Sequence, residues 1–153
     1  MNIRQVFGAS LGVASRVWES ALHLCGYLEE QSVELRGQRI IELGAGTGVV
    51  GILAARLGAV LTLTDPHRPS YGSPKLQANV SANRPSSGWP TSLPNVLPLS
   101  WGEDHMDFSS DWDLVLCADI IPPRDLPPAK EDTSSSVQEW SRGISLVQNA
   151  RRA

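Results

Sequence analysis

The sequence has few of the residues that define metal-binding and disulfide-linked proteins. It contains two cysteines and three histidines in 153 residues. Because Cys25 and Cys117 each stand in an apolar stretch, we expect reduced core thiols in an intracellular protein rather than a disulfide. The histidines at positions 23, 67 and 105 lack the spacing of zinc ligands, so the sequence predicts no metal site.

Long apolar runs and an excess of positive charge are also missing. No stretch approaches the roughly 20 apolar residues that cross a bilayer, and the first residues lack the pattern of a signal peptide. Lys and Arg number 13 against 16 Asp and Glu, for a net charge of −3, so no basic surface for a nucleic acid is indicated. These absences and the length predict one cytoplasmic domain that binds neither membrane nor nucleic acid.

A glycine-rich turn between two apolar segments is the most informative feature. The sequence predicts a buried strand over residues 40–43, a turn over 44–48, a helix over 49–57 capped by Gly58, and a second strand over 59–64. The second strand ends in the acid Asp65. This order predicts a βαβ unit of the kind that binds nucleotides.

The turn and the acid together indicate an adenosine-containing cofactor. Glycine lets the backbone approach a ligand closely, and the helix behind the turn offers free N–H groups to a carboxylate or phosphate. Asp65 follows Gly44 at about the 20-residue distance of an acid that binds ribose hydroxyls. A dinucleotide fingerprint would require a small residue at position 49, which is Val49.

The rest of the chain predicts an α/β fold. Further elements are expected as an amphipathic helix over 13–30, a short helix over 75–83, a loop over 84–94, an edge strand over 96–100 and a strand over 112–119. The last strand is apolar almost throughout, which is typical of a parallel sheet covered by helices. From residue 122 the chain is rich in Pro and Ser, without periodicity until a segment over 137–148, and we expect a flexible tail with no further strands.

Several motifs in a fixed order resemble one family. They are Leu11–Ala14, Val17–Ala21, Glu42–Gly48, Asp65, Leu99–Gly102 and Leu116–Ile121. The chain is similar from about Gln5 to Ile121 to the methyltransferase-like twenty-one group of seven-β-strand protein lysine N-methyltransferases. The resemblance implies a Rossmann-like fold, S-adenosylmethionine as cofactor, and a protein substrate such as a seventy-kilodalton heat-shock chaperone or the elongation factor that delivers aminoacyl-tRNA.

The resemblance also implies roles for individual residues. The implied cofactor-binding residues are Trp18, Glu42, Gly44, Ala45, Gly46, Asp65, Trp101 and Ala118. Gly44, Ala45 and Gly46 would line the methionine end, Asp65 would accept from the ribose hydroxyls, and Trp101 would flank the adenine. Glu42 would orient the loop or bind the cofactor amine through water. For the catalytic role we expect Asp119, at the end of the fourth predicted strand, whose carboxylate would orient the lysine ammonium and favour its deprotonated form.

The chain departs from the family after Ile121. Relatives have an aromatic residue where this sequence has Pro122, so residues 1–121 are expected to form an incomplete methyltransferase domain whose C-terminal strands are missing, followed by the tail over 122–153. A truncated or alternative C-terminus would explain this, and the segment before Gln5 is also expected to be shortened relative to the family. Four alternatives stay open: a cofactor-binding module without catalysis, an unstable product with an exposed sheet edge, a nucleotide-base methyltransferase, and an NAD-dependent oxidoreductase.

Overall fold

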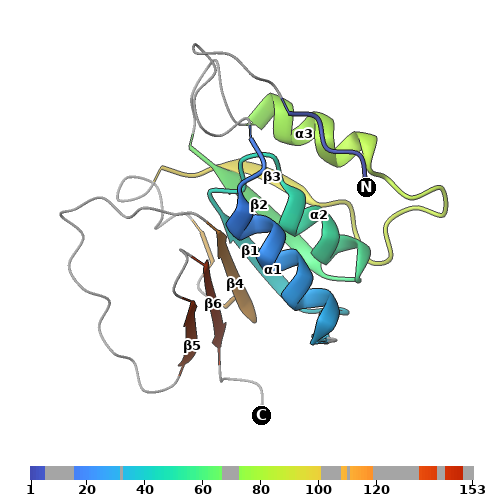
Figure 1. The fold of residues 1–153 in the computed structure, drawn as a ribbon. Coiled ribbons are helices and arrows are strands. Elements are labelled where there is room, and N and C mark those ends of the chain that lie inside the picture. The colour runs from blue at the N-terminus through green and yellow to red at the C-terminus, as the bar shows by residue number, and fades with distance from the viewer. Residues whose placement is uncertain are drawn as a thin grey trace.

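The computed structural model describes residues 1–5, 16–31, 33–66, 73–100, 108–109 and 111–118, together with the backbone of 135–140 and 144–149. Figure 1 shows the chain as a sheet with helices packed against it. The elements are α1 (Glu19–Glu30), β1 (Arg39–Leu43), α2 (Val49–Arg56), β2 (Val60–Asp65), α3 (Ser73–Ala82), β3 (Asn95–Pro98), β4 (Leu114–Ala118), β5 (Ser135–Trp140) and β6 (Ile144–Asn149).

The sheet has the strand order β3-β2-β1-β4-β6-β5. The strands β1 to β4 run parallel, with β1 lying between β2 and β4. The predicted βαβ unit and parallel sheet are thus confirmed, and β3 lies at the predicted edge, next to β2 alone. Because parallel strands end at the same side, the carboxyl ends of β1, β2 and β4 lie along one edge of the sheet.

The helices bury one face of the sheet. Helices α1 and α2 lie side by side in front of the strands (Figure 1) and contact each other. The core contains Leu24 and Leu28 of α1, Ile52 of α2, Leu76 and Val80 of α3, and Ile40, Leu61, Leu63 and Leu116 of the sheet. Burial of each such side chain contributes about 1.5–3 kcal/mol relative to exposure. No helix within the described residues is long and apolar enough to cross a membrane.

Two sequence predictions are wrong. Helix α1 begins at Glu19, and residues 16–18 before it are not helical, although the apolar spacing predicts a helix from Val13. The segment expected to be a flexible tail contains β5 and β6, which pair antiparallel with each other and continue the sheet from β4. Backbone pairing along β4 gives these residues a partner that their composition does not reveal. The predicted domain boundary at Ile121 lies outside the described residues.

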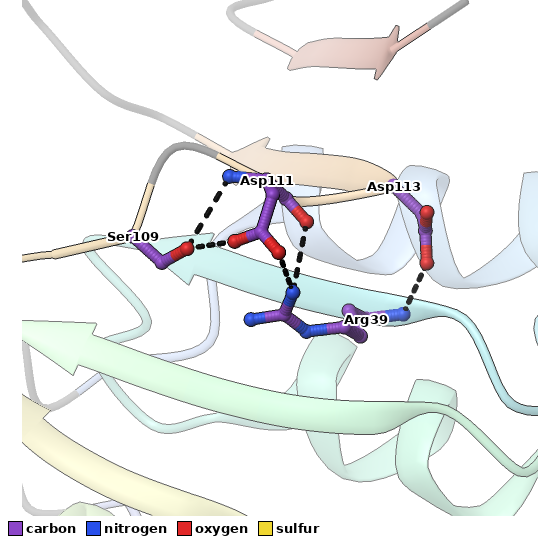
Figure 2. Close-up of polar contacts among 4 residues, drawn as sticks. All are labelled: Arg39, Ser109, Asp111 and Asp113. Carbon is purple, nitrogen blue, oxygen red and sulfur yellow. Dashed lines mark hydrogen bonds and ion pairs between the residues drawn. The ribbon is translucent and has the colours of Figure 1, made fainter. Parts of the chain in front are cut away.

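Arg39, the first residue of β1, binds the segment that precedes β4. Its guanidinium forms an ion pair with Asp111 and lies 5.3 Å from the centre of the Trp112 ring. Its backbone N–H donates to Asp113 Oδ2 over 2.8 Å, and the Ser109 hydroxyl donates to Asp111 (Figure 2). This cluster lies at the amino ends of β1 and β4, so it stabilises the sheet at the edge opposite the glycine turn.

Candidate cofactor-binding site

The glycine turn leaves β1 in a conformation that glycine favours. Gly44, Gly46 and Gly48 have φ angles of 62°, 54° and 78°, in the left-handed region where a Cβ is strained. The N–H of Ala45 donates to Thr64 O over 2.8 Å, and the N–H of Gly48 donates to Ala45 O over 2.7 Å. These bonds fold the loop tightly and attach it to the last residues of β2.

Helix α2 begins directly at this loop. Gly48 is its N-cap and has no side chain to cap the helix, so within the first turn only the Gly51 N–H is bound by a side chain in the described residues, that of Glu42. A Cβ on Gly48 would overlap Leu76 Cδ1 of α3, so α3 presses closely on the loop from outside. The loop therefore offers backbone N–H groups and the positive end of a helix dipole to a ligand.

Asp65 lies next to the loop. It is the last residue of β2 and is 5% exposed, and the carbonyl of Thr64 before it accepts the hydrogen bond from Ala45. Its own backbone carbonyl accepts from Leu99 N–H over 3.1 Å, which holds the chain just after β3 at the same edge. The structure thus brings together the two features that the sequence predicts to share a ligand.

Glu42 is buried beneath the start of α2. It is 4% exposed, and its Oε2 has no hydrogen-bond partner among the residues that the structure describes. The pKa of its carboxyl is raised to about 8, mainly by burial; a backbone hydrogen bond from Gly51 opposes this shift and the charge of Asp65 adds to it. Gly51 is in the first turn of α2, so Glu42 joins β1 to the helix end behind the loop.

This raised pKa predicts a stability that falls as the pH rises. The folded protein holds the Glu42 proton up to about pH 8, whereas the unfolded chain releases it near 4.5. Stabilisation is therefore complete below pH 4.5 and is lost toward pH 8. Urea unfolding should show about 2 kcal/mol less stability at pH 8 than at pH 6 from this group. Glu42→Gln should remove that slope, and an unchanged slope would contradict the assignment.

Trp18 and Ala118 lie at the ends of elements that approach the site. Trp18 immediately precedes α1 and is 38% exposed, so it is not a core residue, and the Arg16 guanidinium lies 5.5 Å from its ring centre. Ala118 ends β4, one residue beyond the pair formed by Leu43 and Cys117. Since Gly44 is one residue beyond Leu43, the register brings Ala118 beside the first residue of the loop.

Two predicted site residues, Trp101 and Asp119, lie outside the described residues. Asn79 was not predicted to belong to the site, but the structure places it against the loop, where its side-chain amide donates to Thr47 O over 2.9 Å. A buried asparagine in the middle of a helix is the signal that could have indicated it, because asparagine is unfavourable there unless its amide is bound.

Burial also changes the two cysteines. Cys25 on α1 and Cys117 on β4 are free and partly buried. Desolvation, together with the charge of the nearby Glu42 carboxylate, raises the pKa of each thiol to about 12. A thiol with so high a pKa is uncharged at neutral pH and is a poor nucleophile. Neither cysteine is therefore suited to covalent chemistry.

Solved structures show the fold class of this domain. The magnesium protoporphyrin IX methyltransferase of Synechocystis PCC 6803, solved with bound SAH, superposes with a TM-score of 0.52 over 86% of this chain and 82% of that chain, at 12% identity. The same enzyme with bound SAM gives 0.50 over 85% and 76%. The chain therefore has the Rossmann-like fold of methyltransferases, as the sequence predicted.

Sequence comparison then gives the family. A family model described as lysine methyltransferase matches residues 1–152, and the chain belongs to that family. It is 51% identical over 122 residues to EEF1A lysine methyltransferase 3 of Xenopus tropicalis, covering 79% of this chain and 51% of that protein. It is 47% identical over 122 residues to protein N-lysine methyltransferase METTL21A of Mus musculus, covering 79% and 53%.

These relatives confirm the resemblance to the methyltransferase-like twenty-one group. The chain spans about half the length of the curated relatives that it matches.

Proposed function

We propose that this chain binds S-adenosylmethionine at the glycine loop and transfers its methyl group to a lysine amine of a protein. The observation that carries the proposal is the hydrogen bond from Ala45 N–H to Thr64 O. It holds the loop and Asp65 side by side at the carboxyl edge of the sheet, where α/β domains of this type bind their ligands. Membership of the lysine methyltransferase family supports the same reaction.

The described residues fit such a cofactor. Left-handed backbone at Gly44 and Gly46 lets the loop approach the methionine end without side chains in the way. The Asp65 carboxylate can accept two hydrogen bonds from a ribose diol. Glu42 sits behind the loop and holds the start of α2, so its role is to orient the loop rather than to contact the ligand from outside.

Three further residues complete the proposed site. Trp18 would cover the cofactor from the start of α1, since its ring is partly exposed there. Ala118 would contact the cofactor from the end of β4, where a small side chain leaves room beside Gly44. Trp101 would flank the adenine, because a flat ring stacks well on a nucleobase.

The cofactor supplies a methyl group on a sulfonium, which is an activated leaving group. The protein must then align the lysine amine, exclude water from it and let its proton leave. Ala118 ends β4 at the carboxyl edge of the sheet, Asp119 is the next residue in the sequence, and we assign it the orientation of the amine. A carboxylate in that position holds the incoming ammonium and accepts its proton before transfer.

The relatives suggest a first substrate to test. Proteins named EEF1A lysine methyltransferase 3, from Xenopus tropicalis and Mus musculus, share 51% and 50% identity with this chain. We therefore propose EEF1A as substrate, with a chaperone as the second candidate, and a cytoplasmic location for the reaction.

A labelling assay tests the proposed function. The full chain is incubated with S-adenosylmethionine carrying a labelled methyl group and with purified EEF1A, and Asp119→Asn serves as the matched variant. Label on a lysine of EEF1A that depends on Asp119 supports the proposal. Cofactor binding by calorimetry without any labelling of EEF1A or of a cell lysate would instead favour a binding module, and no cofactor binding would overturn the proposal.

A further inference from the structure

Every polar atom of the Asn79 side chain is engaged. Its Nδ2 donates to Thr47 O over 2.9 Å and to Arg4 O over 3.3 Å, and its Oδ1 accepts from Arg4 N–H over 3.0 Å. The residue is 1% exposed, so water does not replace these bonds. One amide on α3 therefore joins the glycine loop to the first residues of the chain.

Asn83 repeats half of this arrangement one helical turn later. Its Oδ1 accepts from Asn2 N–H and its Nδ2 donates to Asn2 O, both over 2.6 Å. Residues 2 and 4 both turn backbone groups toward α3, and Asn83 lies one helical turn after Asn79, so the two asparagines bind the segment at alternate residues. Asn83 also donates to Asn79 O, and no bond to the loop is found for it among the described residues.

The bond to Thr47 acts on the part of the loop that begins α2. It fixes the carbonyl of the peptide between Thr47 and Gly48, whose N–H closes the turn on Ala45 O. Leu76, one turn before Asn79 on α3, presses on Gly48 from the same side. Helix α3 thus supports the loop through one polar and one apolar contact.

Residues 1–5 also contact the start of α1. The side chain of Gln5, the residue after Arg4, accepts from Val17 N–H over 3.1 Å. Val17 directly precedes Trp18 and α1. Residues 1–5 therefore bridge α3 and the start of α1, the two elements that flank the loop.

We propose that Asn79 is a positioning residue that holds the Thr47–Gly48 peptide in its ligand-binding shape, and that docking of residues 1–5 on Asn79 strengthens cofactor binding. The inference rests on the proposed function, because it concerns the same loop. If the docked segment favours the binding shape, a bound cofactor must favour the docked segment by the same factor. Asn83 docks the same segment without touching the loop, so its replacement separates the small effect of lost docking from the larger effect of losing the bond to Thr47.

The first experiment compares Asn79→Ala with Asn83→Ala in the full chain. Asn79→Ala leaves Thr47 O and Arg4 N–H without partners, and we expect the Kd for S-adenosylhomocysteine to rise about tenfold. Amide hydrogen exchange at Gly46 and Gly48 should accelerate in the same variant without ligand. Asn83→Ala should leave both quantities within about threefold of the native chain at a similar loss of unfolding midpoint. Equal effects of the two variants would overturn the inference.

A second pair of variants leaves α3 intact. Arg4→Pro removes the N–H that Asn79 Oδ1 accepts, whereas Arg4→Ala keeps it and removes only the side chain. We expect Arg4→Pro alone to raise the Kd for S-adenosylhomocysteine about threefold, and saturating ligand to slow amide exchange of Arg4 in the native chain. An unchanged Kd for Arg4→Pro, or unchanged exchange at Arg4, contradicts the coupling.

The two proposals fail differently. If the native chain does not bind S-adenosylhomocysteine, the proposed function is wrong, while the exchange of the loop amides in Asn79→Ala still reports whether Asn79 holds the loop. If the native chain binds and Asn79→Ala binds equally well, only the role of Asn79 is wrong.

Discussion

Replacement of Asp65 by Asn is expected to weaken binding of S-adenosylhomocysteine about 100-fold. A carboxylate that accepts from two ribose hydroxyls forms two charge-assisted hydrogen bonds, each contributing about 1.5–3 kcal/mol. Asparagine keeps the shape but has no charge and turns one acceptor into a donor. Because Asp65 is 5% exposed at the end of β2, the surrounding solvent cannot replace the lost interactions fully. Isothermal titration of the native and variant chains measures the change.

Asp113→Asn is the matched control for this prediction. Asp113 is also a carboxylate beside a strand, but it accepts from Arg39 N–H at the amino end of the sheet, away from the loop (Figure 2). We expect this variant to lose some stability and to bind the ligand with native affinity. Equal affinities for native chain and Asp65→Asn would remove the cofactor assignment on which the methyl-transfer proposal depends.

The strands around the loop could be predicted because their signals are local. The apolar runs that form β1, β2 and β4, and the glycine that ends α2, each depend on residues within a few positions of one another. The predicted start of α1 is wrong because apolar residues continue at helical spacing before Glu19, while the backbone there bonds to Gln5 instead. Strands β5 and β6 were not predicted because β6 is held by its pairing with β4, a contact between distant parts of the chain, and β5 pairs with β6 in turn.

The site, like the fold, could be predicted where it depends on residues close together in the sequence. Glycine spacing and the following acid indicate the loop and Asp65, since both depend on the geometry of one βαβ unit. The burial of Glu42 and the bonds of Asn79 could not be foreseen, because they depend on how α2 and α3 pack on the sheet. The bond between Asn79 and Arg4 joins residues that are 75 positions apart, and a single sequence does not reveal such a pairing.

Helix α2 also approaches the sheet so closely that one of its residues must be glycine. A Cβ on Gly51 would overlap Leu63 Cδ2 and Glu42 Oε2, and would lie 2.9 Å from Leu61 Cδ2. The atoms in the way are ends of side chains, but Leu63, Glu42 and Leu61 are 0%, 4% and 2% exposed. The packed core around them therefore leaves no space into which they could move. Gly51→Ala is therefore expected to lower the free energy of unfolding by about 3 kcal/mol, at the upper end of the usual cost of overpacking.

Gly26→Ala is the matched control, since Gly26 also lies inside a helix but has nothing within 4 Å of the position that an alanine methyl group would take. Alanine should stabilise α1 by about 0.5–1 kcal/mol, because glycine loses more backbone entropy on folding. Urea unfolding of both variants should thus give shifts of opposite sign. Gly51→Ala should also weaken S-adenosylhomocysteine binding, because moving α2 outward displaces the loop from which it begins. Shifts of the same sign would show that α2 does not rest on β1 and β2 as closely as this packing requires.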